Sequence, residues 1–442
     1  MKTTNLFLRC SFLIVLLLTN CKLTDYTLQD SNPDYLHRSV KKLTEVIVHD
    51  IFSPPVASRI YAYTMVAGYE VLVNKYPDYQ SLEGQLRDLK DVPKPEKGKE
   101  YCFPLASMHA ILSTAKMNFI FSPEKIEEFE NQLYEEYKNM GIPDEVYANS
   151  LMYGTKVAEH IIAWAKKDNY RESRTFPKYE IRDEAARWKP TPPTYLTAVE
   201  PHWGKIRSMM LDSASQFMPP RPPAFDTTRN SLFFKEVLEV YEVKKNLTKE
   251  QIEIAKFWDN NPFVMNLVGH ASFASKQISP GGHWIGITKI ATTQNKSDLM
   301  QTLAAYTTTS IAMFEGFISC WDEKYRSNLI RPESVINKYI DKDWTPLLQT
   351  PPFPEYTSGH SVVSSAIAQT LTAQYGNFAF TDSTEVEYGF TVRAYKSFED
   401  AANEACLSRL YGGIHYRAAI EQGKEQGKKV GDWVVQKLKL KK

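Results

Sequence analysis

Apolar side chains recur at helical spacing along the first third of the chain, where strand-like alternation is scarce. This period of 3.6 residues predicts helices over residues 36–52, 55–75, 104–121, 124–140 and 144–167. Ser122-Pro123-Glu124 and Ile142-Pro143-Asp144 are helix-start signals, because a first-turn proline lacks only an N–H that the helix leaves unpaired. We therefore expect a bundle of about four or five helices over residues 21–170.

Proline density changes this pattern between residues 171 and 229. Nine prolines fall between Pro177 and Pro223, including adjacent pairs at 192–193, 219–220 and 222–223. Proline has no backbone N–H to donate and its ring blocks regular helix, so the stretch is predicted to be irregular. We interpret it either as a connector that wraps over the helices or as a rim that shapes access to a site.

Helical periodicity returns near residue 230 and predicts further helices over 248–259, 298–325, 358–375, 398–411 and 415–438. Asn260–Phe263 and Gly281–Trp284 are interpreted as interruptions of this pattern, and Trp258 and His283 as core or surface side chains. The predicted fold class is all-α, with a bundle over 21–170, a proline-rich connector over 171–229 and a second bundle over 230–442. We expect the active site in the core of this second bundle.

Charge and cysteine content argue against several classes of function. The 442-residue chain has a formal net charge of only +1, so nothing favours a nucleic-acid partner. Cys102, Cys320 and Cys406 are scattered and odd in number, which does not indicate a disulfide framework. No Cys/His zinc cluster, phosphate-binding loop or dinucleotide fingerprint appears. Beyond residue 20, no apolar run approaches the roughly 18 residues needed to span a bilayer.

Residues 1–20 have the pattern of a secretory leader. Lys2 and Arg9 precede an apolar run over residues 10–18. The run ends at Leu18-Thr-Asn-Cys21, which resembles a bacterial lipobox whose cysteine is lipidated after cleavage. We expect an exported bacterial protein, held by lipidated Cys21 at the outer membrane, in the periplasm or at the cell surface. A plain secretory signal is the alternative.

The candidate chemistry lies in three short segments of the C-terminal part. They are Lys324-Tyr-Arg-Ser-Asn-Leu-Ile-Arg331-Pro332, Ser358-Gly359-His360 and Ser408-Arg409-Leu-Tyr-Gly-Gly-Ile-His415. Together they supply three cations, a hydroxyl, a glycine amide and two imidazoles. Guanidinium groups pair bidentately with oxyanion oxygens and lysine adds a compact charge. This set of groups predicts a site for a tetrahedral anion such as phosphate or vanadate.

The spacing within these segments favours a shared site. Lys324 and Arg331 are seven residues apart, nearly two helical turns, so both can project from one helix face. Ser358 and Gly359 precede an apolar helical pattern, which places them at a helix N-terminus where free amides favour an anion. The glycine pair at 412–413 predicts a helix break that turns neighbouring side chains toward one ligand.

The three segments resemble the motifs of the superfamily that joins type 2 phosphatidic acid phosphatases, bacterial acid phosphatases and vanadium-dependent haloperoxidases. The resemblance implies that His415 is either the phosphoryl acceptor or the axial ligand of vanadate, and that His360 is the general acid–base. The residues that it implies hold the remaining oxygens are Lys324, Arg331, Ser358, Gly359 and Arg409.

Two aromatic residues favour the haloperoxidase branch. Trp321 lies three residues before Lys324 and Phe353 lies five before Ser358, the offsets of the aromatic pair that lines the halide pocket in fungal-type and related bacterial haloperoxidases. Polarizable ring edges suit a weakly hydrated halide, although both rings also fit an ordinary core. The implied activity is oxidation of halide, iodide or bromide favoured, by hydrogen peroxide with vanadate as cofactor. His360 would move the proton and Lys324 would polarise the peroxide.

One position departs from the superfamily pattern. The phosphatases, and several haloperoxidases, place an Asp four residues after the final histidine to orient it, whereas this chain has Ala419. No replacement can be named from the sequence. Two alternatives stay open: a metal-free acid phosphatase that cleaves a phosphomonoester through a phosphohistidine at His415, and a non-catalytic anion-binding lipoprotein.

Overall fold

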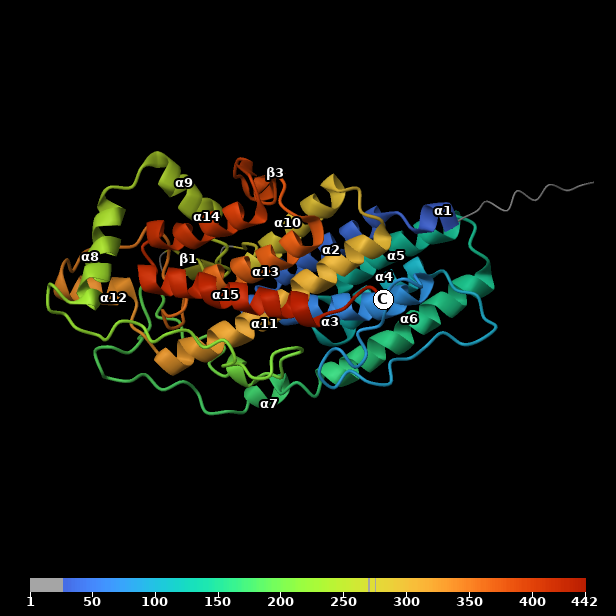
Figure 1. Ribbon diagram of the computed structural model, residues 1–442, viewed down its shortest axis with the longest axis horizontal. Helices are drawn as coiled ribbons and strands as arrows, with labels where there is room; N and C mark the ends of the chain where they lie inside the picture. Colours follow the sequence, from blue (N-terminus) through green and yellow to red (C-terminus); the bar gives the residue numbers. More distant parts are fainter. Residues whose placement is uncertain (1–26, 269–270, 275) are drawn as a thin grey trace, which may run out of the picture.

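Helices occupy most of the chain in the order that the hydrophobic pattern predicts (Figure 1). The structure is a computed structural model that describes residues 27–442 except 269, 270 and 275. Its first helices are α1 (Thr27–Asp30), α2 (Pro33–His49), α3 (Pro54–Leu72), α4 (Phe103–Asn118), α5 (Pro123–Asn139) and α6 (Asp144–Ala165). The ends of the five longer helices lie within three residues of the predicted ranges.

A second series of helices fills the C-terminal part. It comprises α8 (Leu232–Lys245), α9 (Lys249–Phe257), α10 (Pro280–Gln294), α11 (Leu299–Ser327), α12 (Pro332–Tyr339), α13 (Gly359–Tyr375), α14 (Phe398–Tyr411) and α15 (Arg417–Lys437). Two short antiparallel hairpins accompany them, β1 (Met265–Val268) with β2 (Ala271–Ala274) and β3 (Phe380–Asp382) with β4 (Arg393–Tyr395). The predicted all-α fold class is therefore confirmed.

Helix α10 corrects one prediction. Gly281–Trp284 does not interrupt the helical pattern but forms the first turns of α10, which Ser279 caps by accepting from the amide of Gly282 at 3.1 Å. The glycines are there for close packing, because a Cβ added at Gly281 would lie 2.3 Å from the sulfur of Met313 on α11. A glycine pair therefore marks a helix contact here and not a break.

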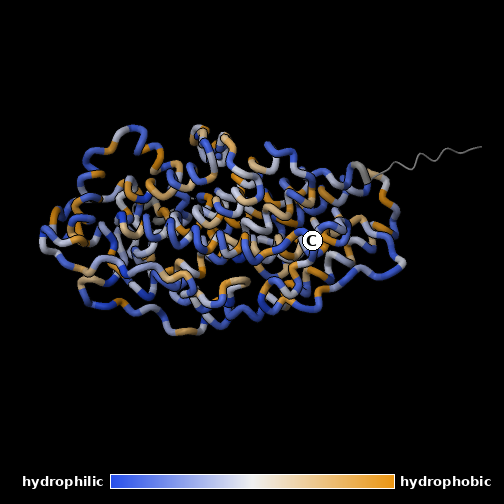
Figure 2. Tube along the Cα trace, in the orientation of Figure 1, coloured by the Kyte–Doolittle hydropathy of each residue, from blue (hydrophilic) through white to orange (hydrophobic). Residues whose placement is uncertain are grey.

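One continuous hydrophobic core links the two series of helices. α3 is buried along its whole length and packs against α4, α6 and α11. α11, α13 and α15 lie side by side in the C-terminal part (Figure 1). Figure 2 shows hydrophobic residues alternating with hydrophilic ones along the helices, as expected for helices that bury one face. α11 thus connects the first helices to the elements that carry the candidate chemistry.

The proline-rich stretch runs along the helices with little regular structure. It contains α7 (Tyr170–Ser173) at its start and a 3-10 turn at Trp203–Lys205. Glu315, fully buried on α11, holds this stretch by accepting from the amides of Met209 (2.5 Å), Met210 (3.1 Å) and Leu211 (3.0 Å). Across the described residues, every helix is too short or too polar to cross a bilayer.

Candidate active site

Lys324 and Arg331 reach the site from two different elements. α11 ends at Ser327, and Asn328 closes it with a left-handed backbone at φ 47°. Arg331 then lies at the N-terminus of α12. The prediction that Lys324 and Arg331 project from one face of a single helix is therefore wrong, because the helix ends between them.

The two cations instead converge on one segment, residues 353–357. The Nζ of Lys324 donates to three backbone carbonyls, those of Pro354 (3.0 Å), Glu355 (3.1 Å) and Thr357 (2.5 Å). The Nε of Arg331 donates to the carbonyl of Phe353 at 2.9 Å. Both side chains are fully buried, and burial lowers the pKa of Lys324 to about 7. Backbone carbonyls therefore position both cations.

His415 follows the break that the glycine pair predicts between α14 and α15, where Gly413 has a φ of +76°. Its Nδ1 lies 2.9 Å from Oε1 of Glu355, and its Nε2 lies 3.1 Å from a terminal nitrogen of Arg331. Because a guanidinium only donates, Nε2 accepts and Nδ1–H donates to the carboxyl group. Burial, together with the charges of Arg331 and Lys324, lowers the pKa of His415 well below its usual value, so the ring is neutral.

Ser358, Gly359 and His360 begin α13 as predicted. The hydroxyl of Ser358 caps the helix by accepting from the amide three residues on, at 3.3 Å. Gly359 lies against the indole of Trp321, where an added Cβ would lie 3.4 Å from Cζ3. The residue His360 is partly exposed, but its Nε2 is buried and has no hydrogen-bond partner among the residues that the structure describes.

Arg409, in the last turn of α14, is held by the loop that follows α9. It donates to the carbonyls of Trp258 and Asp259, the latter at 3.3 Å, and to the hydroxyl of Ser408 at 2.9 Å. Burial lowers the pKa of Arg409 to about 10, so it remains a cation at neutral pH. Burial and the charge of Arg409 lower the pKa of His360 well below its usual value. Both imidazoles of the site are therefore neutral.

A cavity gathers residues from two of the three motifs. His360, Arg409 and His415 line it together with Trp321 and Phe353, whose ring centroids are 4.9 Å apart. The other walls are mostly apolar and include Pro54, Phe263, Phe317 and Ile414. Two neutral imidazoles and a guanidinium thus share one small space with an aromatic pair.

Lys324, Arg331 and Ser358 do not line this cavity and lie behind its walls. Arg331 contacts the lining residue His415, and the ring of Phe353 lies 5.1 Å from the guanidinium of Arg331 and 5.0 Å from the ammonium of Lys324. In the described part of the chain, no three His, Cys, Asp or Glu side chains gather closely enough to hold a metal cation. The arrangement suits an anion, because buried positive charge surrounds the cavity.

Comparison with known proteins identifies the family. A solved structure described as the first bacterial vanadium-dependent iodoperoxidase is 50% identical to this chain with a TM-score of 0.87, and the match covers 92% of this chain and 97% of that one. The chain belongs to the vanadium-dependent haloperoxidases. A family model for the second helical-bundle domain of VCPO also matches residues 304–441 of this haloperoxidase.

Two more distant structures share the fold of this haloperoxidase. Holo- and apo-type structures of a bacterial vanadium-dependent chloroperoxidase are each 18% identical with a TM-score of 0.65. The matches cover 88% and 87% of this chain and 93% and 94% of those chains. No curated protein matches the chain. The family membership that the three motifs predicted is confirmed.

Glu355 is the functional-site residue that sequence reasoning missed in this haloperoxidase. It is fully buried, and its Oε1 accepts from His415 Nδ1 and from the amide of Tyr416, both at 2.9 Å. Its carboxyl group orients the imidazole of His415. In the superfamily pattern an Asp at position 419 would do this, and Ala419 has no carboxyl group. The only sequence signal was an acidic residue inside the apolar segment before Ser358.

The loop between α9 and β1 is a second part of the site that the sequence did not reveal. Asp259, Asn260 and Asn261 line the cavity beside His360. Asp259 is partly buried, and burial raises its pKa to about 6 despite the opposing charge of Arg409. A chain stretch predicted as a simple interruption of the helices therefore forms a polar wall of the haloperoxidase cavity.

Proposed function

We propose that this haloperoxidase uses vanadate to oxidise iodide with hydrogen peroxide. One iodide, one peroxide and one proton give hypoiodous acid and water. The observation that carries the proposal is the pairing of a neutral His415 Nε2 with the buried guanidinium of Arg331 beside the cavity. The 50% identity with a bacterial iodoperoxidase supports iodide over bromide.

The residues at the site fit vanadate. Arg331 and Lys324 are completely buried and Arg409 nearly so, and none of the three forms an ion pair with a carboxylate in the described residues. One terminal nitrogen of Arg331 is buried without a hydrogen-bond partner among those residues. Buried donors without acceptors and buried cations without an ion-pair partner destabilise a fold. A tetrahedral oxyanion supplies both hydrogen-bond acceptors and the opposite charge. We propose that Arg331, Arg409, Ser358 and the amide of Gly359 hold its oxygens.

His415 is the proposed ligand to the metal. Its Nε2 carries the free lone pair, because Glu355 keeps the proton on Nδ1. When bound, vanadate supplies Lewis acidity that activates peroxide without a change in the oxidation state of vanadium. Arg331 also donates toward Nε2, and its guanidinium would bond the oxyanion instead where that atom is a ligand.

His360 is the proposed acid–base group. Its neutral Nε2 has no partner in the described residues and its ring lines the cavity, so it is placed to take a proton from peroxide. Lys324 was expected to polarise the peroxide. Its three ammonium protons point to the carbonyls of Pro354, Glu355 and Thr357, so we propose that it acts through its charge.

Trp321 and Phe353 are the proposed halide pocket. Both line the cavity next to His360, and the adjacent buried cations attract an anion. Aromatic ring edges carry partial positive charge and are poorly hydrated, which suits the large, polarizable iodide ion. The walls formed by Phe263 and Phe317 extend this apolar surface.

The direct test loads purified protein with vanadate and measures peroxide-dependent oxidation of iodide, bromide and chloride in parallel. We expect turnover with iodide above that with bromide and no activity without vanadate. Absence of activity with all three halides contradicts the proposal. Hydrolysis of a generic phosphomonoester by the vanadate-free protein, abolished by added vanadate, would instead support the phosphatase alternative.

We also propose that the protein is exported and lipid-anchored at Cys21. The leader and Cys21 lie outside the described residues, so the proposal depends on the charge pattern and the lipobox-like sequence before Cys21. Metabolic labelling with a fatty-acid probe should mark the full chain, and Cys21→Ser should remove the label. Unlabelled protein cleaved near residue 20 would indicate a plain secretory signal.

A further inference from the structure

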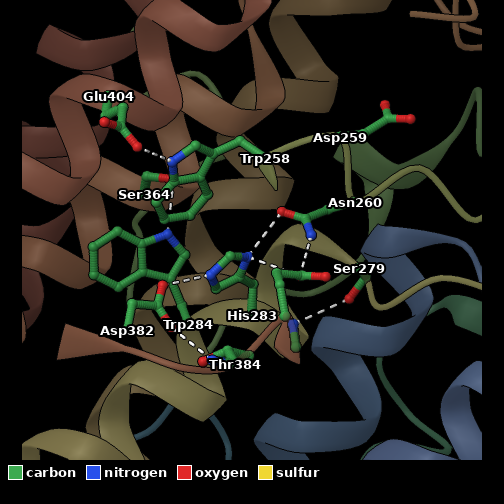
Figure 3. A network of polar contacts seen from close by, with 12 residues as sticks. Trp258, Asp259, Asn260, Ser279, His283, Trp284, Ser364, Asp382, Thr384 and Glu404 are labelled. Atoms are coloured by element: carbon green, nitrogen blue, oxygen red, sulfur yellow. Dashed lines mark hydrogen bonds and ion pairs between the residues drawn. The ribbon is translucent and has the colours of Figure 1, made fainter. Parts of the chain in front are cut away.

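A fully buried histidine outside the cavity lies between two carboxylates. His283, in the first turn of α10, places Nε2 2.7 Å from Asp382 (Figure 3). Its Nδ1 lies 3.0 Å from Glu385. Burial disfavours the charged imidazole, but the two carboxylates outweigh it and raise the pKa of His283 to about 9. A buried cation is thus held by two anions from the segment that follows α13.

This histidine also holds the loop after α9. Its ring stacks on Trp258 with centroids 4.2 Å apart and an interplanar angle of 12°. Its Nδ1 lies 3.2 Å from the side-chain oxygen of Asn260, whose amide nitrogen donates to Glu385 at 2.7 Å. Asn260 has a positive φ of 43°, a conformation that needs support from its surroundings. The cluster His283–Asp382–Glu385 supplies that support through both side-chain ends of Asn260.

The same loop meets the proposed oxyanion site on its other side. The carbonyls of Trp258 and Asp259 accept from the guanidinium of Arg409. Asp259 and Asn260 line the cavity beside His360. The loop therefore separates the His283 cluster from the cavity and contacts both.

We infer that His283, fixed by Asp382 and Glu385, is a positioning residue for the oxyanion site. It holds Trp258 and Asn260, and the loop carbonyls in turn aim the guanidinium of Arg409 at the anion. The inference rests on the proposed function, because it assigns Arg409 to an anion. His283 touches none of the reacting atoms.

The test needs a variant that removes the interaction and leaves as little uncompensated buried charge as possible. Removing His283 alone leaves both Asp382 and Glu385 uncompensated in the core, which strongly destabilises a fold. The double variant His283→Gln/Asp382→Asn replaces one ion pair by a neutral hydrogen-bonding pair of similar size. His37→Gln is the matched control, because His37 is a buried histidine on α2 that bonds Tyr306 at 2.9 Å.

The measurement is the dissociation constant of the full-length protein for orthovanadate and for inorganic phosphate, by calorimetry well below each variant's melting temperature. We expect the double variant to bind both anions about tenfold to hundredfold more weakly, the usual effect of losing a group that orients a ligand residue. His37→Gln should keep wild-type affinity whatever its melting temperature. A folded double variant with wild-type affinity for both anions overturns the inference.

Two further measurements distinguish failure of this inference from failure of the variant to fold and from failure of the proposed function. If the double variant does not fold, Glu385→Leu decides in the same assay, because it removes the acceptor that tethers Asn260 and leaves the His283–Asp382 pair intact. Weaker anion binding by this variant supports the inference, and unchanged binding overturns it. If wild-type protein binds both anions but oxidises no halide, the proposed function fails, while the phosphate measurements still decide the role of His283.

Discussion

Glu355 accepts a hydrogen bond from Nδ1 of His415 at 2.9 Å, although the two residues come from different segments of the chain. The same oxygen accepts from the amide of Tyr416, so one buried carboxyl group fixes both the ring and the backbone beside it. Burial raises the pKa of Glu355 to about 8, against the opposing charge of Arg331. Glu355 can therefore hold the tautomer of His415 as a hydrogen-bond acceptor, even when it carries a proton.

Glu355→Leu should weaken vanadate binding about tenfold to hundredfold, because Nδ1 of His415 loses the group that orients it. Glu355→Gln should retain most of the affinity at neutral pH, because its amide oxygen can accept both hydrogen bonds. The dissociation constants of the two variants for vanadate provide the check. Equal losses in both would show that the negative charge matters and not the acceptor.

A matched control for Glu355→Leu exists among the first helices. Glu70 is also buried and accepts from one side chain, Ser81, and one backbone amide, that of Leu82. Glu70→Leu should destabilise the fold by about 1–3 kcal/mol for each donor left unpaired, as should Glu355→Leu. Only Glu355→Leu should change the affinity for vanadate.

Anion affinity should fall as the pH rises through about 7. Burial lowers the pKa of Lys324 to about 7, and a bound anion favours the charged ammonium. Below this pH the lysine is already charged, and above it binding must take up a proton, so affinity decreases with rising pH. Sulfate is the suitable probe, because its own charge stays constant over this range. Lys324→Met should bind weakly at every pH without this step, and a pH-independent wild-type affinity would contradict the assignment.

Trp321→Phe should raise the KM for iodide while leaving the dissociation constant for vanadate unchanged, because Trp321 lines the cavity but makes its own hydrogen bond to the carbonyl of Val199. Phe353→Leu should raise both the KM for iodide and the dissociation constant for vanadate. Its ring lies 5.1 Å from the guanidinium of Arg331, and losing such a contact costs about 0.5–1 kcal/mol, or about twofold to fivefold in affinity. Halide-resolved kinetics on vanadate-loaded protein check both. If both variants keep the wild-type KM for each halide, Trp321 and Phe353 do not form the halide pocket.

Stability should decrease as the pH rises through about 7 because of Glu315. Burial raises the pKa of this carboxyl group to about 7 from 4.5, although three amides oppose the shift. The pKa of Glu315 is higher in the folded state than in the unfolded state. Its contribution to the free energy of unfolding is therefore complete below pH 4.5 and is lost as the pH rises through the folded-state pKa of about 7. In urea unfolding from pH 5 to 8, the free energy of unfolding of wild type relative to Glu315→Gln should fall up to about pH 7 and then level off. A constant difference would disprove this.

Local patterns predicted most of the helices but not how their ends meet. α11 and α14 are found close to the predicted residues, but Lys324 and Arg331 do not share a helix, because α11 ends at Ser327 and Asn328 takes a left-handed backbone. The glycine pair at 281–282 was misinterpreted as a break. Whether a glycine ends a helix or admits a neighbour depends on what packs there, in this case Met313, which the local sequence does not show.

The sequence by itself determined the family, the all-α class and the chemical groups of the site, because motifs and hydrophobic periodicity are local properties of the chain. Only the tertiary structure decided which distant groups support them: Glu355 beneath His415, and the loop at 258–261 between Arg409 and His283. These contacts join residues that no periodic rule relates. They arise from the way buried polar groups find partners once the helices have packed.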